Sequence, residues 1–401
     1  MKKKYLQLLT VGVLTAAMLA GCGDSSEDAD KEKGGVVFEQ VAEPVGAPEE
    51  EEPAEEMTEE EPVLEDVPPA EGMVRDFFTN EWVNEDQNVK RPLAVMFPID
   101  KEAQPQYGLD HVSVFYEIEE EGKMSRQMGI VENWEGLERI GNIRSIRDYF
   151  IYAALEYDPV IIHFGGPELY LYQTPGAVLN RNNRADVENL NGVGGKMGPE
   201  AGAFFRVPAG STSAHTAYTD GEHVAKAMEK EGYQANHRTQ YIGEPHFQFA
   251  AFNEPNTLEQ YADAKEVKEI NMAGTYPVTK SALSYNESDG LYYKTLYGNK
   301  QVDGASGEQL AFANVIIQST YSEVRDAKGY LAFQMHDTTR DGYFFTKGRM
   351  IHVNWKKTAD YEPTRYYDDN GEEVKFNTGK TMIFVAREGV YFEADGEKIE
   401  L

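Results

Sequence analysis

The chain has 401 residues, with 69 Asp and Glu against 38 Lys and Arg, a formal net charge of −31 and a single cysteine. This length suffices for about two to three domains of roughly 150 residues each. So acidic a chain lacks the clustered Lys and Arg of a nucleic-acid binder, and one cysteine excludes an internal disulfide framework and a cysteine-based zinc site.

The first 21 residues have the pattern of a signal peptide. Three lysines precede an apolar stretch over 6–18, which is shorter than the ~20 residues that span a bilayer. Leu19-Ala20-Gly21-Cys22 then resembles a bacterial lipobox. This resemblance implies cleavage before Cys22, a diacylglyceryl thioether on its sulfur, and acyl chains such as palmitate. We therefore expect a lipoprotein held on the extracytoplasmic face of the cell membrane; the alternative for Cys22 is a buried free thiol.

Residues 22–76 are predicted to be a disordered tether. Nineteen acids but two bases lie between Gly23 and Gly72, and prolines interrupt the glutamate runs at 49–52 and 59–61. Such a segment buries too little apolar surface to offset its ordering entropy. We interpret it as a self-repelling spacer; the alternative is a binding segment for a cation or a partner.

Residues 77–275 are predicted to form a layered α/β domain. Apolar runs predict strands at 92–97, 112–118, 126–132 and 159–164. The second and third of these pair through a turn at 119–123 that contains Gly122. Apolar residues at helical spacing predict a helix over 143–157, and a second helix starts at Thr219 or Asp220 and ends at Gly232. Helices that alternate with strands indicate α/β layers.

Residues 276–401 are predicted to form a smaller, mainly β domain. Short segments rich in β-branched and aromatic residues alternate with turn signals such as Asp303-Gly304. The predicted strands are 283–285, 291–297, 310–320, 330–335, 343–346 and 350–355.

Between Arg91 and Glu393 the sequence resembles the YerB-like bacterial lipoproteins, a family of two domains of unknown function. The matching segments are Arg91-Pro92-Leu93-Ala94-Val95-Met96, Pro105-Gln106-Tyr107-Gly108-Leu109, Ile143-Arg144-Ser145-Ile146-Arg147, His163-Phe164-Gly165-Gly166, Ala313-Asn314-Val315-Ile316-Ile317-Gln318 and Arg365-Tyr366-Tyr367-Asp368-Asp369-Asn370-Gly371. The resemblance implies an α/β first domain, a smaller second domain and no established activity.

Arginines are the first candidates for a binding site. Arg144 and Arg147 are three apart and would share one side of the predicted helix, with the Ser145 hydroxyl between them. Arg126 and Arg206 come from other segments. Arginine forks suit carboxylate and phosphate, so these residues predict a site for an anionic envelope ligand. The alternative is that carboxylates of the chain hold the arginines, and its candidates are Glu117, Glu121 and Asp148.

His163 ends a predicted strand before Gly165 and Gly166, where open α/β sheets bind ligands. It is a candidate ligand contact or general base; the alternative is a histidine bonded to a loop carbonyl. His215 and Glu117 complete a second candidate set, with both histidines as acid-base groups and Glu117 as their orienting carboxylate.

Two functions from different classes follow. The first is a membrane-anchored protein that binds an anionic ligand or an envelope partner, and the second is a cell-envelope hydrolase or transferase. The eight histidines are scattered and no Walker or Gly-x-Gly-x-x-Gly loop occurs, so neither a metal nor a cofactor is predicted. Both functions, and the oligomeric state, stay open at this point.

Overall fold

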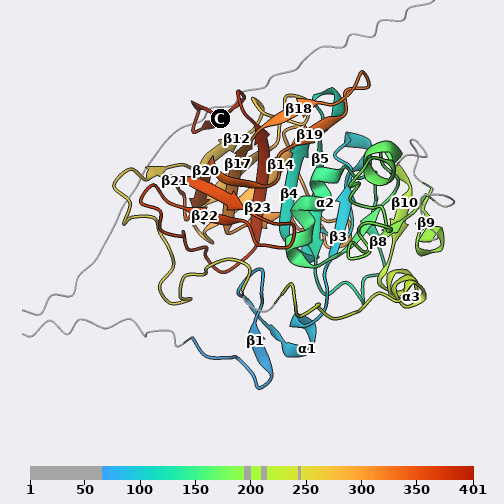
Figure 1. Ribbon diagram of the computed structural model, residues 1–401. Coiled ribbons are helices and arrows are strands. Elements are labelled where there is room, and N and C mark those ends of the chain that lie inside the picture. The colour runs from blue at the N-terminus through green and yellow to red at the C-terminus, as the bar shows by residue number, and fades with distance from the viewer. Residues whose placement is uncertain (1–65, 194–199, 209–214, 243–244) are drawn as a thin grey trace, which may run out of the picture. The chain divides into compact units, whose positions relative to one another are not determined.

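A computed structural model describes residues 66–193, 200–208, 215–242 and 245–401. The predicted signal peptide, Cys22 and the part of the predicted tether up to residue 65 lie outside these ranges. Within them the chain is mostly sheet with few helices (Figure 1). No helix in the described part is long and apolar enough to cross a membrane.

The largest sheet of the described residues has 11 strands, most of which fill one path (Figure 1). In order across the sheet they are β11 (Lys265–Glu266), β21 (Arg349–Lys357), β20 (Asp337–Thr346), β17 (Asn314–Thr320), β23 (Thr381–Arg387), β4 (Val112–Glu119), β5 (Ser125–Val131), β3 (Leu93–Phe97), β7 (Val160–His163) and β8 (Asn189–Asn191), with β22 (Arg365–Tyr367) paired to β21. The predicted division at residue 275 does not interrupt this sheet, because β23 pairs in parallel with β4.

Strand direction distinguishes the two ends of the strands in this sheet. Strands β17, β23 and β4 are parallel neighbours, as are β3, β7 and β8, and β5 is antiparallel to both β4 and β3. All six therefore run the same way. We call the side where they end the carboxyl edge and the side where they begin the amino edge.

A second sheet has seven strands. They are β15 (Asn299–Lys300), β14 (Leu291–Leu296), β13 (Ala282–Asn286), β12 (Glu269–Asn271), β24 (Tyr391–Ala394), β25 (Glu397–Glu400) and β16 (Ala311–Phe312). The smaller sheets are β1 (Met73–Arg75) with β2 (Trp82–Asn84), β6 (Ile140–Gly141) with β10 (Ala217–Thr219) and β9 (Phe205–Arg206), and β18 (Ser322–Val324) with β19 (Leu331–Phe333).

The three α-helices of the described residues are short. They are α1 (Glu85–Asn88), α2 (Asp148–Ala154) and α3 (Gly221–Glu231). Of the two caps predicted for α3, the structure uses Asp220, whose carboxylate accepts from the His223 amide at 2.7 Å. Gly232 ends this helix in the left-handed conformation, with φ of 72°.

The helix predicted over 143–157 begins later than expected, at Asp148. The backbone amides of Ile143, Arg144 and Ile146 bond to Ala217, Met96 and Gly165, at 2.8, 2.9 and 3.1 Å. These tertiary bonds hold the segment extended, so its apolar residues are buried without helix formation. Arg144 and Arg147 consequently share no helix face, which corrects the prediction.

Both faces of the large sheet are buried. Along β23, Ile383 and Val385 belong to one apolar cluster, whereas Met382 and Phe384 belong to the other. This double burial explains the continuous apolar runs from which the strands were predicted.

Candidate functional site

Three of the predicted site residues meet at the carboxyl edge. Arg126 Nη1 donates to Ser145 Oγ at 2.7 Å, and Arg147 Nη1 donates to the same oxygen at 3.1 Å. Arg126 also pairs with Glu120 at 2.6 Å, and Arg147 Nε donates to Glu121 at 2.9 Å. We call these five residues the arginine cluster.

The arginine cluster is neutralised by the chain itself. Arg126 and Glu120 are both buried, and burial lowers the pKa of Arg126 and raises that of Glu120. Glu121 pairs with Arg147 as the alternative predicted. The other two candidate carboxylates bind elsewhere: Asp148 pairs with Arg325 at 2.7 Å, and Glu117 pairs with a lysine described below.

Arg144 and Arg206 occupy other positions. The Arg144 backbone bridges two strand ends, since its amide donates to Met96 and its carbonyl accepts from Phe164. Arg206 lies on β9, where it donates to Thr216 Oγ1 at 2.8 Å and its guanidinium lies 4.9 Å from the centre of the Phe164 ring.

His163 is fully buried at the end of β7. Its Nδ1 lies 2.8 Å from the Gly165 carbonyl and its Nε2 lies 3.1 Å from Asn189 Oδ1. Burial lowers the pKa of His163, so the ring is neutral near pH 7. A Cβ on Gly166 would lie 2.8 Å from the Ile146 carbonyl, so this glycine permits close backbone packing. The contacts correspond to the loop-carbonyl alternative.

Glu117 serves a different partner from the one predicted. It is fully buried and pairs with Lys294 of β14 at 2.8 Å, and Ser125 and Ser281 each donate to it at 2.6 Å. His215 is buried beside β10. The contacts found among described residues join neither histidine to Glu117, so the second candidate set is not assembled there.

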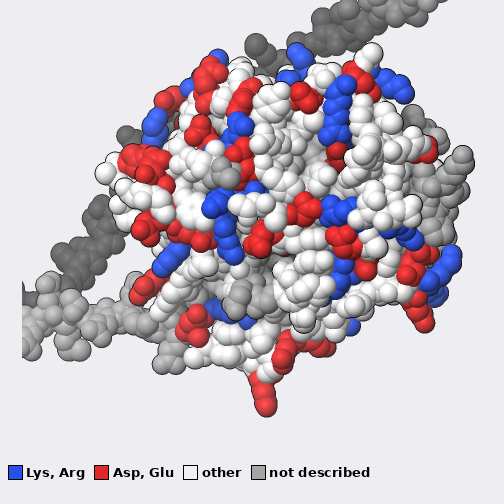
Figure 2. Space-filling view, viewed as in Figure 1, with Lys and Arg blue, Asp and Glu red and all other residues white. Residues whose placement is uncertain are grey.

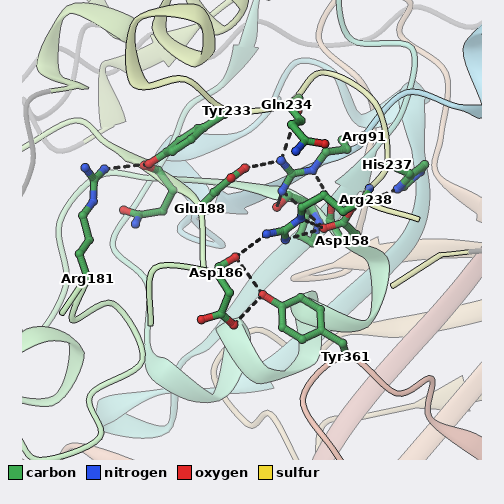
Figure 3. Close-up of polar contacts among 12 residues, drawn as sticks. Arg91, Asp158, Arg181, Asp186, Glu188, Tyr233, Gln234, His237, Arg238 and Tyr361 are labelled. Carbon is green, nitrogen blue, oxygen red and sulfur yellow. Dashed lines mark hydrogen bonds and ion pairs between the residues drawn. The ribbon is translucent and has the colours of Figure 1, made fainter. Parts of the chain in front are cut away.

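A further polar network lies where β7 begins, around Asp158 (Figure 3). The Asp158 carboxylate accepts from Arg238 Nε and from the Arg238 amide, both at 2.7 Å, and Arg91 Nη2 lies 3.6 Å away. Arg91 also donates to the carbonyls of Asp158 and Pro159. Burial raises the pKa of Asp158, but His237, whose Nδ1 lies 3.6 Å away, the hydrogen bonds from Arg238 and the Arg91 charge hold that pKa below its ordinary value. These contacts fix the 234–238 segment to the sheet.

Cavities lie along the amino edge, and three of them share Asp110. The largest two occupy about 440 and 350 Å³ and the third about 110 Å³. We call the three together the amino-edge groove, and its parts the loop cavity, the apolar cavity and the acid cavity. The loop cavity is lined by Tyr107, Gly108, Asp110, His111, Gly136, Leu137, Glu138, Arg139, Asp303, Ala305 and Ser306. The apolar cavity is lined by Glu81, Leu109, Asp110, Val112, Leu291, Glu308, Gln309, Leu310, Ala311, Phe312, Ala313, Thr378, Gly379 and Lys380. The acid cavity is lined by Asp76, Thr79, Glu81, Val83, Asp110, His111, Val112, Ser113, Glu132, Asn133 and Lys380.

Two of the carboxyl groups that line the acid cavity, those of Asp76 and Glu132, lie in different environments. Asp76 Oδ1 accepts from the Thr79 amide and hydroxyl at 2.7 and 2.8 Å, whereas Glu132 accepts from the Ser113 hydroxyl. Burial, with the Asp76 charge, raises the pKa of Glu132 well above its ordinary value. Lys380 Nζ donates to the Asp110 carbonyl at 2.6 Å, and burial lowers the pKa of this amine. Perturbed groups in a cavity are a recognised mark of functional sites.

The sequence gives little sign of this groove. Asp110, Glu132 and Lys380 belong to no local motif and meet because the starts of β4 and β23 are adjacent. One signal was available, the Asp303-Gly304 turn, since the Asp303 carboxylate accepts from the amide of Leu109 at 2.7 Å. Among the residues that the structure describes, no three His, Cys, Asp or Glu side chains are placed to hold a metal ion.

Comparisons with known proteins place the chain among proteins without an assigned activity. Residues 78–234 match a family described as "Protein of unknown function (DUF3048) N-terminal domain", and residues 270–383 match the corresponding C-terminal domain. A Bacillus subtilis (strain 168) protein named "Putative lipoprotein YerB" is 25% identical over 301 residues, 74% of this chain and 78% of its own length. The crystal structure of YerB protein from Bacillus subtilis superposes with a TM-score of 0.63 at 22% identity, covering 78% of this chain and 96% of that one.

Proposed function

The chain belongs to the YerB-like family of paired DUF3048 domains, and from this premise we propose that it is a lipid-anchored, extracytoplasmic protein that binds a ligand in the amino-edge groove. Anchoring through Cys22 is supported by the lipobox-like residues 19–22 and by a relative named as a lipoprotein. Ligand binding is supported by one observation above all, the sharing of Asp110 by three cavities.

The arginine cluster is the weaker of the two sites for a ligand. An anion there would have to displace Glu120 and Glu121, which already occupy the guanidinium groups of Arg126 and Arg147. Breaking such buried pairs is costly, because each leaves a charge without its partner. The groove offers space without that cost.

A single substitution tests the groove. Ala311 lies half-buried in the wall of the apolar cavity, so Ala311→Trp would fill that cavity. Pools of soluble muropeptides, teichoic-acid fragments and short peptides would be added separately to the chain from Gly23 onward. We expect at least one pool to raise the Tm of the native chain and to lose this effect with Ala311→Trp, because bound ligand stabilises the folded state.

Ala251→Trp is the matched control, since Ala251 is exposed and lines none of the three cavities. This variant should respond to the pools like the native chain. A pool that stabilises native chain and Ala311→Trp equally, or the absence of any stabilising pool, would contradict binding in the groove.

A further inference from the structure

We propose that the amino-edge groove docks a basic peptide segment of a partner protein, with an aliphatic side chain in the apolar cavity and a Lys or Arg side chain in the acid cavity. This inference rests on the proposed function and specifies the chemistry of the ligand. The apolar lining of one cavity and the acidic lining of the groove support this docking.

The apolar cavity has an aliphatic and aromatic wall. Leu109, Val112, Leu310 and Phe312 line it and are each no more than 7% exposed. A volume of about 350 Å³ accommodates several side chains, and an apolar wall gains free energy by removing aliphatic surface from water. A bare polyamine or inorganic cation would leave this wall uncovered.

The charge of the groove favours a cation. The carboxyl groups that line its three cavities are those of Asp76, Glu81, Asp110, Glu132, Glu138, Asp303 and Glu308, against the cations Lys380 and Arg139. The Arg139 guanidinium lies 4.6 Å from the centre of the Tyr107 ring. Acids thus outnumber bases in the groove, and a basic segment is complementary to it.

The acid cavity adds a link to pH. The charged or titratable groups that surround Glu132 are Asp76, Glu81, Asp110, His111 and Lys380, with the Ser113 hydroxyl bonded to it. Because the pKa of Glu132 is raised, this carboxyl stays protonated at pH values where an ordinary glutamate is ionised. A lysine ammonium of the peptide binds the ionised Glu132 carboxylate more tightly than the protonated carboxyl. The affinity of the peptide should therefore rise as pH rises through the raised pKa.

The test uses labelled six-residue peptides and the chain from Gly23 onward, followed by fluorescence anisotropy. The probes are alternating Lys-Leu, Glu-Leu and Lys-Ser peptides with blocked ends. We expect Lys-Leu to bind at least about tenfold more tightly than the other two, since it alone carries both the charge and the apolar side chains. Asp110→Asn and Glu81→Gln should each weaken Lys-Leu binding about threefold, as expected for rim charges.

The control is Glu323→Gln, the same charge change on the β18–β19 hairpin, which follows β17 at the opposite edge. It should leave the affinity unchanged. Equal weakening by Glu323→Gln and Asp110→Asn would show attraction to net charge alone and overturn the proposal, as would equal binding of Lys-Ser and Lys-Leu. If one of the ligand pools of the Tm experiment stabilises the native chain but not Ala311→Trp, while the Lys-Leu peptide does not bind, ligand binding in the groove stands and docking of a basic peptide is refuted.

Discussion

At the scale of single residues, His246 is a buried base without a charge. It is 2% exposed, it stacks on Tyr157 with ring centres 4.3 Å apart, and its Nε2 lies 3.9 Å from the Glu156 carboxylate. Burial lowers the pKa of His246 to about 4, and the Glu156 charge only partly opposes this effect. The folded protein therefore keeps this ring neutral under mildly acid conditions in which the unfolded chain protonates it.

This difference predicts an acid sensitivity. Between the unfolded pKa of about 6.5 and the folded value of about 4, the unfolded state binds the extra proton, so stability falls as pH falls through that window. We expect the native chain to lose about 3 kcal/mol more than His246→Phe between pH 7 and pH 4. Urea unfolding of both proteins at several pH values measures this, and parallel pH profiles would refute the assignment to His246.

At the scale of secondary-structure elements, a buried ion pair joins the two sheets. Lys294 of β14 reaches Glu117 of β4 at 2.8 Å, and both side chains are fully buried. Burial lowers the pKa of Lys294, and the Glu117 charge opposes that shift. Ser125, Ser281 and the Gln127 amide supply further hydrogen bonds to the carboxylate, so the pair is well satisfied.

Removing one member of this pair should be severe. Lys294→Met leaves the Glu117 charge buried without its cation, and we expect a loss of about 3–5 kcal/mol in the free energy of unfolding. Glu117→Gln combined with Lys294→Met should recover much of that loss, because no charge remains. Urea denaturation measures both, with Lys265→Met in the exposed pair with Glu397 as the matched control. A double variant no more stable than Lys294→Met would show that packing, not charge, sets the effect.

The strands were predictable, whereas the start of α2 and the groove were not. The apolar runs at 92–97, 112–118 and 159–164 contain strands buried on both faces, and local composition suffices to recognise them. The predicted start of the helix was wrong because the backbone amides of Ile143 and Ile146 donate to carbonyls of distant segments. The spacing of apolar residues in the sequence does not reveal such bonds. The amino-edge groove depends on the adjacency of β4 and β23, a fact of topology that no local pattern contains.

Arginine placement was predictable only in part. Arg126, Ser145 and Arg147 do meet, but Glu120, which holds two of them, was not among the expected partners. Sequence indicates which residues can pair, whereas strand register decides which pairs form.

At the scale of the whole molecule, the distribution of charge and the predicted membrane location depend on different parts of the chain. About half of the net charge of −31 lies in residues 23–72, and the rest is distributed over the body. The face shown in Figure 2 carries acidic and basic side chains intermixed, without a continuous basic stripe.

The predicted membrane location depends on the sulfur atom of Cys22. Cys22→Ser should abolish incorporation of labelled palmitate and move the chain from the membrane fraction to the soluble fraction. The reason is that the predicted diacylglyceryl group and its acyl chains are attached through Cys22. Ser25→Ala, three residues away, should leave both readouts unchanged. A Cys22→Ser chain that stays in the membrane fraction would point to anchoring by the uncleaved leader instead.

The position of β23 between β4 and β17 also governs how the fold is reached. The first half of the large sheet is synthesised with the outer edge of β4 open, because β23, the strand that covers this edge, follows all other strands of this sheet in the chain. Pairings between residues so far apart give a high contact order, which slows folding and prolongs exposure of an unpaired strand edge. The sheet therefore closes only after β23 has been synthesised, and a truncation that removes β23 would leave an aggregation-prone edge rather than a smaller stable protein.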